Sequence, residues 1–235
     1  GRIGRQRQTS ASIQSIHQPA HGLLEIVCRP QVWPGHRSGQ FVLADFGKAR
    51  EGQHPFTIAS AWDPRQGTLT LCIKALGDFT RELPHHLQIG QSIRLEGPYG
   101  QFDFAASQAV DRNPQIWIAG GIGITPFIAW LEALQSKPIH AAAIDLHYCT
   151  RSSVDDPFVS RLEILCAAVP GMKLHVHADD QPAGPSLAEW LLSEAGQAGS
   201  ELWFCGPTGL AEHARQALAP LGHQRALQQR VGLHQ

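Results

Sequence analysis

The sequence has no Cys-x-x-Cys pair and an odd number of cysteines. The five cysteines are scattered over 235 residues, at Cys28, Cys72, Cys149, Cys166 and Cys205. Disulfide frameworks, structural zinc sites and iron–sulfur clusters need paired or closely spaced cysteines. The pattern therefore argues against all three and favours a reducing compartment.

An excess of charge of one sign is also missing. Lysine and arginine number 19 against 20 aspartates and glutamates, and the formal net charge is −1. This balance gives no sign of a nucleic-acid partner, which a basic patch would favour. Ser160 and Ser186 lack the glycine-flanked elbow of a hydrolase nucleophile, which argues against hydrolysis.

Metal-ligand spacing is absent although the chain has thirteen histidines. His175 and His177 fall on one face of an expected strand, and His85 is next to His86. No carboxylate or cysteine lies at ligand spacing around them along the chain. We therefore expect no metal site and no haem ligated by these histidines.

A long apolar run is missing as well. Residues 116–131 carry no charged side chain, but a membrane-spanning helix needs about 20 apolar residues. The stretch also contains three glycines and Pro126. A buried strand, a glycine-rich turn and an apolar helix explain it better than a membrane span.

The first half of the sequence is typical of β-structure. Short apolar or alternating runs are separated by glycine and proline turns, and residues 68–74 alternate cleanly. Such spacing predicts a closed or nearly closed antiparallel β-barrel. A short helix is expected over residues 80–87, with Thr80 as its cap. The expected strands cover residues 12–16, 22–28, 40–45, 56–59, 68–75 and 92–96.

The second half alternates between strand-like and helix-like runs. This alternation predicts an open, mainly parallel α/β sheet with helices on both faces. A polar stretch at residues 105–113 separates the halves, so we predict two domains, residues 1–108 and 109–235. The expected strands cover 115–119, 142–148, 173–177 and 201–205, and the expected helices cover 126–135, 157–168, 186–193 and 210–218.

Two segments of the barrel half have residues suited to a flavin nucleotide. In residues 54–60, the hydroxyl of Thr57 can face a ring nitrogen such as flavin N5, and Ser60 offers another donor. In residues 74–80, a glycine turn leads into a helix whose free N–H groups and dipole suit a phosphate. Taken alone, the first segment is equally an ordinary strand and the second a helix start without a ligand.

Three further segments fall where turns are expected. Residues 96–102 predict a tight turn after a barrel strand. Residues 119–126 place glycines between a strand and a helix, where backbone N–H groups can approach a pyrophosphate, although Pro126 replaces the third glycine of the usual dinucleotide fingerprint. Cys205, Gly206 and Pro207 end another strand, at the edge where open α/β sheets bind ligands.

Taken in this order, the segments resemble the ferredoxin–NADP reductase superfamily, and most closely its ferric reductase and NADPH oxidase branch. That superfamily commonly opens its flavin motif with Arg-x-Tyr-Ser/Thr, and the branch variant stands here as His54-Pro55-Phe56-Thr57. The resemblance implies an FAD-binding barrel followed by an NAD(P)H-binding domain. It implies a flavin lined by His54, Pro55, Phe56, Thr57 and Ser60, and FAD phosphates along Lys74, Gly77 and Thr80. It implies a dinucleotide cradled by Gly120, Gly121, Gly123, Thr125 and Pro126, with Cys205, Gly206 and Pro207 under the nicotinamide.

The expected reaction is hydride transfer from nicotinamide C4 to flavin N5, followed by release of single electrons to haem, ferric iron or oxygen. The protein must hold two rings in contact rather than supply a strong acid or base. Thr57 and Cys205 are the candidate catalytic residues. Arg151, after the second α/β strand, is a candidate clamp for the 2′-phosphate of NADPH, which we favour over NADH. The alternative is a solvated Arg151 paired with Asp155 or Asp156.

The branch usually places its flavin domain after haem-binding transmembrane helices. Because the chain opens at Gly1, without Met, on basic residues, we expect an excised domain at the cytoplasmic face of a membrane, attached to a haem-containing transmembrane domain. A solvated terminus is the alternative. The family also ends on an aromatic over the flavin, which is missing after residues 231–235, so Phe102 or Trp62 is considered in its place. Two other functions stay open: a soluble reductase component with a separate protein acceptor, and a non-catalytic module.

Overall fold

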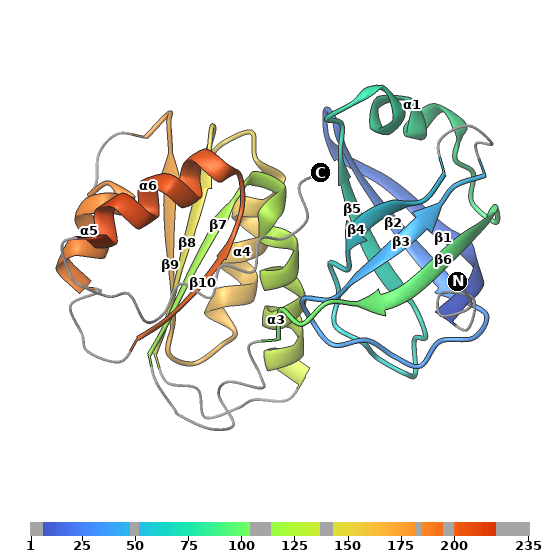
Figure 1. The fold of residues 1–235 in the computed structure, drawn as a ribbon, viewed down its shortest axis with the longest axis horizontal. Coiled ribbons are helices and arrows are strands. Elements are labelled where there is room, and N and C mark those ends of the chain that lie inside the picture. The colour runs from blue at the N-terminus through green and yellow to red at the C-terminus, as the bar shows by residue number, and fades with distance from the viewer. Residues whose placement is uncertain are drawn as a thin grey trace. The chain divides into compact units, whose positions relative to one another are not determined.

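The computed structural model describes residues 7–47, 52–103, 114–136, 143–181, 185–194 and 200–219. The chain divides into two units (Figure 1). Of the described residues, unit 1 contains those up to Asp103 together with Thr125–Ala133, and unit 2 contains the others. The predicted domain boundary and the C-terminal segment at residues 231–235 lie outside the described residues.

Unit 1 is built on a six-stranded antiparallel sheet with the strand order β4-β3-β6-β1-β2-β5. A bridge between Ile58 and Leu71 joins the chain after β4 to β5, so the two edges of the sheet meet. This confirms the predicted nearly closed barrel. The elements are β1 (Gln8–Ala20), β2 (Leu23–Pro30), β3 (Phe41–Asp45), β4 (His54–Thr57), β5 (Leu69–Lys74), α1 (Asp78–His86) and β6 (Ser92–Tyr99).

Alternation along each strand decides which side chains fill the barrel. In β3, Val42 and Ala44 are fully buried, whereas Phe41, Leu43 and Asp45 are partly exposed. This is the period of two that a pleated strand imposes when one face is packed. The same alternation decides which residues of β4, the strand with the predicted flavin motif, face the barrel core and which face outward.

Strand β6 continues where we predicted a tight turn. It passes through Gly97 and Pro98 and ends at Tyr99, which pairs with Phe41 of β3. The register shifts between Phe41 and Leu43. The turn prediction is wrong because such an irregularity lets a strand pass through glycine and proline that would otherwise end it.

Residues Thr125–Ala133 of helix α3 (Thr125–Ser136) belong to unit 1. The indole N–H of Trp130 donates to the Ser38 carbonyl at 2.9 Å, and its ring stacks on Phe102 with centroids 4.8 Å apart. The Ser38 hydroxyl donates to the Ala129 carbonyl at 2.8 Å. Phe102 is therefore committed to packing, which argues against its use as a flavin cover.

Unit 2 is a parallel four-stranded sheet with the order β10-β7-β8-β9. Its strands are β7 (Gln115–Gly120), β8 (Ile144–Thr150), β9 (Met172–Ala178) and β10 (Glu201–Cys205), and a 3-10 turn, η2 (Gly121–Ile124), leads from β7 into α3. Helices α5 (Leu187–Glu194) and α6 (Thr208–Leu218) lie together on one side of the sheet, and α4 (Pro157–Ala167) lies on the other (Figure 1). The predicted open α/β sheet is confirmed.

The apolar run that follows residue 115 is explained by burial in this sheet. Every residue of β7 is buried, because β7 lies between β10 and β8. Within the described ranges, no helix is long and apolar enough to cross a membrane.

Candidate functional site

The predicted flavin motif is divided between two faces of β4. Phe56 is buried in the barrel core opposite Val42, so its side chain points inward and only its backbone is available to a ligand. Alternation places Pro55 and Thr57 on the outer face, where both are partly exposed. The Thr57 hydroxyl forms no hydrogen bond with the described residues. The outer face therefore offers a free hydroxyl, which fits a flavin ring nitrogen.

His54 shares the inward face with Phe56 and lies against helix α1. Its imidazole stacks on Phe79, with centroids 4.2 Å apart and planes at 19°. His54 Nε2 is buried and has no hydrogen-bond partner. An unpaired buried nitrogen within a predicted nucleotide site fits a polar group of FAD as its missing partner.

The predicted phosphate segment lies next to the flavin segment in unit 1. The Ile58–Leu71 bridge joins the two strands, and the Thr70 N–H donates to the Ser60 hydroxyl at 3.0 Å. Ser60 is thus partly used by the barrel itself. Lys74 ends β5, is exposed and makes no ion pair with the described residues, so its ammonium group is available to a phosphate.

The start of helix α1 differs from the prediction. Gly77 is the N-cap, and Thr80 lies three residues later, where its hydroxyl accepts the N–H groups of Leu76 and Gly77 at 2.9 and 3.1 Å. Thr80 therefore caps the helix from its third position, not from the cap itself. The N–H groups of the first turn, from Asp78 onward, remain without intrahelical acceptors, as at every helix start.

The predicted dinucleotide turn lies at the carboxyl end of β7. Gly121 has φ +52°, a left-handed conformation that favours glycine. Thr125 and Pro126 are buried at the start of α3, whereas Gly121 and Ile122 are partly exposed. The surface that the turn offers to a ligand is therefore the backbone of Gly121 and Ile122.

The second turn of unit 2, after β10, packs directly on the first. Cys205 pairs with Ala119, and a Cβ on Gly123 would lie 2.3 Å from the Cys205 carbonyl oxygen. A Cβ on Gly206 would lie 3.0 Å from the backbone nitrogen of Gly120, and one on Gly120 would lie 2.8 Å from Pro207. The structure therefore brings together the two segments predicted around the nicotinamide. Cys205 itself is buried and ends β10.

The loop after β8 leaves Arg151 unpaired. Arg151 is exposed and forms no ion pair with the described residues. The nearby carboxylates are occupied: Asp156 accepts the Tyr148 hydroxyl at 2.7 Å, and Asp155 accepts the Ser152 hydroxyl at 3.2 Å. The ion pair with Asp155 or Asp156 is not formed among the described residues, and the exposure of Arg151 fits the solvated side chain of the same alternative.

Strands β8 and β9 also assemble a histidine cluster that the sequence did not indicate. His147 Nδ1 lies 2.9 Å from His177 Nε2, and His175 Nε2 lies 2.8 Å from an Asp145 carboxylate oxygen. His147 packs on Trp190 of α5, with ring centroids 3.9 Å apart. No carboxylate lies at ligand spacing from these histidines along the chain, but pairing of β8 with β9 brings Asp145 beside His175. In the described part of the chain, no group of three or more such side chains could hold a metal ion.

The chain is similar to flavin-dependent reductases. A family described as FAD-binding domain matches residues 20–103. The vanillate O-demethylase oxidoreductase of Pseudomonas putida is 33% identical over 148 residues, which cover 63% of this chain and 43% of the relative. The Pseudomonas putida flavohemoprotein is 25% identical over 234 residues, which cover 94% of this chain and 55% of that relative. The Arabidopsis thaliana ferric reduction oxidase 4 is 38% identical over 87 residues, which cover 36% of this chain and 12% of that relative.

Solved structures share the two-unit fold. Flavohemoglobin from Malassezia yamatoensis, with bound FAD and haem, matches with a TM-score of 0.79 at 17% identity, covering 97% of this chain and 60% of that one. A ferredoxin NADP+ reductase from Neisseria gonorrhoeae matches with a TM-score of 0.76 at 16% identity, covering 97% and 98%. The match to the flavohemoprotein spans about half the length of that curated relative.

The fold and the FAD-binding match define a flavin-dependent oxidoreductase. Residues 20–103 match an FAD-binding domain, and the two-unit fold is similar to that of a ferredoxin NADP+ reductase. The family match supports binding of FAD by unit 1.

Proposed function

We propose that this chain is an NAD(P)H dehydrogenase that passes hydride from NADPH, less readily from NADH, to FAD and then delivers single electrons to haem, ferric iron or oxygen. One observation carries the proposal. A single chain combines an FAD-binding barrel with a parallel sheet whose two ligand-edge turns pack on each other, at Gly123 and Cys205.

In unit 1, the residues that hold FAD are those left free by the barrel. Thr57 donates its unused hydroxyl to flavin N5 from the outer face of β4, and His54 Nε2 gains its missing partner. Lys74 and the first-turn N–H groups after Gly77 neutralise the phosphates. When bound, FAD supplies a two-electron acceptor that can release electrons singly.

In unit 2, the backbone of Gly121 and Ile122 faces the pyrophosphate, and the Cys205–Pro207 turn lies beneath the nicotinamide. Electrostatic attraction to a helix N-terminus favours the pyrophosphate at this position. Arg151 binds the 2′-phosphate of NADPH because its guanidinium is exposed and unpaired. Hydride transfer would require the flavin and nicotinamide rings to stack in the complex with both nucleotides.

We further propose that the chain works at the cytoplasmic face of a membrane, joined to a haem-containing transmembrane domain. The similarity to ferric reduction oxidase 4 and the basic residues Arg2, Arg5 and Arg7 support this. The main alternative is a soluble component with a separate protein acceptor. Similarity to the vanillate O-demethylase oxidoreductase and to a naphthalene dioxygenase reductase component supports that alternative.

Anaerobic titration of the FAD-loaded protein tests the proposal. Addition of NADPH is expected to bleach the visible flavin absorbance in proportion to nucleotide added, and addition of ferricyanide, a one-electron acceptor, is expected to restore it. Protein that binds FAD but is bleached by neither nucleotide would contradict the proposed reaction. Protein that binds no FAD would favour a non-catalytic module.

A further inference from the structure

Unit 1 contains a hollow that shares with the predicted flavin residues only Trp62, which was considered as a cover for the flavin ring. It has a volume of about 560 Å³ and opens between the loop before β3, Trp62, the start of β1 and the end of β6. Small-molecule sites in proteins commonly have volumes of about 300–1,000 Å³. The hollow therefore has room for a ligand larger than a single inorganic ion.

The charge that lines this hollow is positive. Among the described residues that line it, Arg7 and Arg37 are the only charged side chains, and none is a carboxylate. His36 also lines it, but burial lowers the pKa of this histidine and so disfavours its charged form. Trp33 donates to His36 Nδ1 at 3.3 Å, so Nε2 carries the hydrogen and donates to the Ser60 carbonyl at 3.0 Å. A ligand in the hollow therefore meets two guanidinium groups and no opposing charge on its walls.

Several donors in the hollow are still unused. The guanidinium of Arg7 makes one hydrogen bond, to the Pro98 carbonyl at 3.3 Å, and lies over the Tyr99 ring, 5.4 Å from its centroid. The indole N–H of Trp62 has no acceptor among the described residues. A Cβ at Gly35, where φ is +85°, would lie 2.9 Å from that indole nitrogen. Glycine at position 35 therefore keeps the space beside this donor open.

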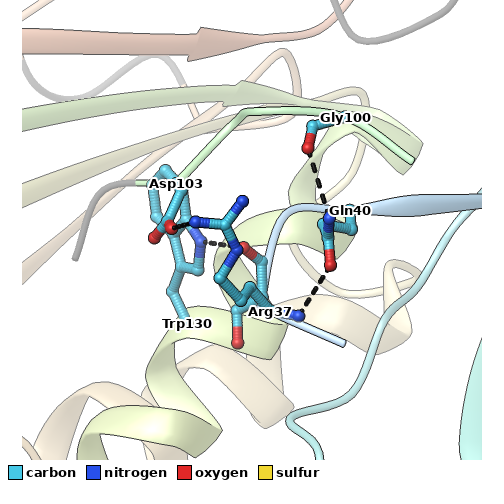
Figure 2. Close-up of polar contacts among 6 residues, drawn as sticks. Arg37, Gln40, Gly100, Asp103 and Trp130 are labelled. Carbon is cyan, nitrogen blue, oxygen red and sulfur yellow. Dashed lines mark hydrogen bonds and ion pairs between the residues drawn. The ribbon is translucent and has the colours of Figure 1, made fainter. Parts of the chain in front are cut away.

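The loop that presents Arg37 is fixed in place. Arg37 Nη1 pairs with Asp103 at 2.7 Å, and the Arg37 N–H donates to the Gln40 side-chain oxygen at 2.8 Å (Figure 2). Gln40 in turn donates to the Gly100 carbonyl at 3.3 Å (Figure 2). These contacts hold the loop in one position, so binding needs little reorganisation of it.

We propose that this hollow binds a phosphate ester, with the guanidinium groups of Arg7 and Arg37 and the indole N–H of Trp62 on its oxygens. Guanidinium groups match phosphate oxygens in geometry and charge, and three separate donors suit the three free oxygens of a phosphomonoester better than the two of a carboxylate. The indole ring covers the organic part. The phosphate belongs either to a soluble phosphomonoester or to the head group of an anionic lipid. The lipid source rests on the proposed membrane attachment.

The first test is a titration of the FAD-loaded, ¹⁵N-labelled protein with glycerol 3-phosphate at constant ionic strength. The Trp62 indole N–H resonance, assigned with Trp62→Phe, is expected to shift and to saturate. Arg7→Gln and Arg37→Gln are each expected to weaken binding roughly five- to tenfold, the loss of one charge-assisted contact. Asp103→Asn is expected to tighten binding, because Arg37 then loses its neutralising partner.

Arg94→Gln is the matched control. Arg94 has the same side-chain exposure as Arg37, 61%, and also faces an aspartate, Asp45, but it does not line the hollow. This variant is expected to bind as the wild type does. An unmoved Trp62 resonance, an equal shift with sodium chloride, or equal losses in Arg94→Gln and Arg37→Gln would overturn the proposal.

Binding of the protein to phosphatidylcholine vesicles with and without phosphatidic acid distinguishes a lipid head group from a soluble phosphomonoester. Binding that needs phosphatidic acid, Arg7 and Arg37, and that glycerol 3-phosphate competes away, identifies a lipid ligand. Binding of glycerol 3-phosphate alone identifies a soluble ester. If Arg7→Gln or Arg37→Gln releases FAD, the hollow belongs to the flavin site and the proposal is wrong. Failure of flavin bleaching by NADPH in wild-type protein contradicts the proposed function instead.

Discussion

The imidazole of His54 stacks on the ring of Phe79, with centroids 4.2 Å apart. This contact ties strand β4 to the first turn of helix α1, and so joins the two segments proposed to hold the flavin and its phosphates. The Nε2 atom of the same imidazole is buried without a partner. An unsatisfied buried polar group costs about 1–3 kcal/mol, and the proposed contact with FAD would remove that cost.

His54→Phe tests this relationship. The variant keeps a flat ring against Phe79 and removes the unpaired nitrogen. We expect FAD affinity to fall roughly tenfold, while the unfolding free energy of the FAD-free protein rises by about 1 kcal/mol. Fluorescence titration with FAD and urea unfolding measure the two effects, with the exposed His17→Phe as control. Unchanged FAD affinity would show that His54 does not contact the cofactor.

Gly123→Ala tests the contact between the two turns of unit 2. The added methyl group would lie 2.3 Å from the Cys205 carbonyl oxygen, so one turn must move. We expect a loss of about 2 kcal/mol or more in unfolding free energy and weaker NADPH binding. Gly209→Ala, in α6 with no atom within 4 Å of the new methyl group, should be neutral or stabilising. Equal stability of the two variants contradicts the packing described.

Arg151→Gln separates the two nicotinamide nucleotides. Because Arg151 is exposed and unpaired, its removal should leave the fold intact and raise KM for NADPH roughly tenfold, with little change for NADH. Lys173→Gln is the charge-matched control, since Lys173 lies near the amino end of β9, away from the ligand edge. An equal change of KM for both nucleotides removes the proposed 2′-phosphate contact.

The pH dependence of stability follows from His147. This side chain is fully buried, and burial, with the charges of His175 and His177, lowers its pKa from 6.5 to about 2. A lowered folded-state pKa means that the unfolded chain binds the proton first. Stability should therefore be constant above about pH 6.5 and fall as pH drops below it, by about 1.4 kcal/mol per pH unit for this one group.

Urea unfolding of unit 2 between pH 7 and pH 4.5 measures this slope. His147→Phe keeps an aromatic ring against Trp190. It should reduce the change of unfolding free energy with pH by the contribution of one proton, about 1.4 kcal/mol per pH unit. His213→Asn, on the exposed face of α6, should leave it unchanged. A wild-type slope that His147→Phe does not reduce assigns the acid sensitivity to other groups.

Local patterns were enough to predict the order and type of the elements. The alternation at residues 68–74 predicted β5, and the uncharged run after residue 115 predicted β7, its glycine turn and α3. Both follow from short-range periodicity and turn chemistry. Placement of Gly120–Gly123 beside Cys205 also followed, because parallel strands end at one edge of a sheet.

Features that depend on neighbouring strands were not predictable. The β6 register shift at Gly97 and Pro98, the Asp145 partner of His175, and the inward position of Phe56 all require knowledge of which strands pair and in what register. The hollow around Arg37 combines four segments that are far apart in sequence. No spacing along the chain indicates such an arrangement.

Direct hydride transfer is the central claim, and isotopic labelling tests it. The FAD-loaded protein is mixed anaerobically with NADPH deuterated at the transferred C4 position, and flavin absorbance is followed by stopped flow. The account predicts rapid bleaching with NADPH and slower bleaching with the deuterated nucleotide. Flavin that stays oxidised with both NADPH and NADH, in protein that retains FAD, would contradict it.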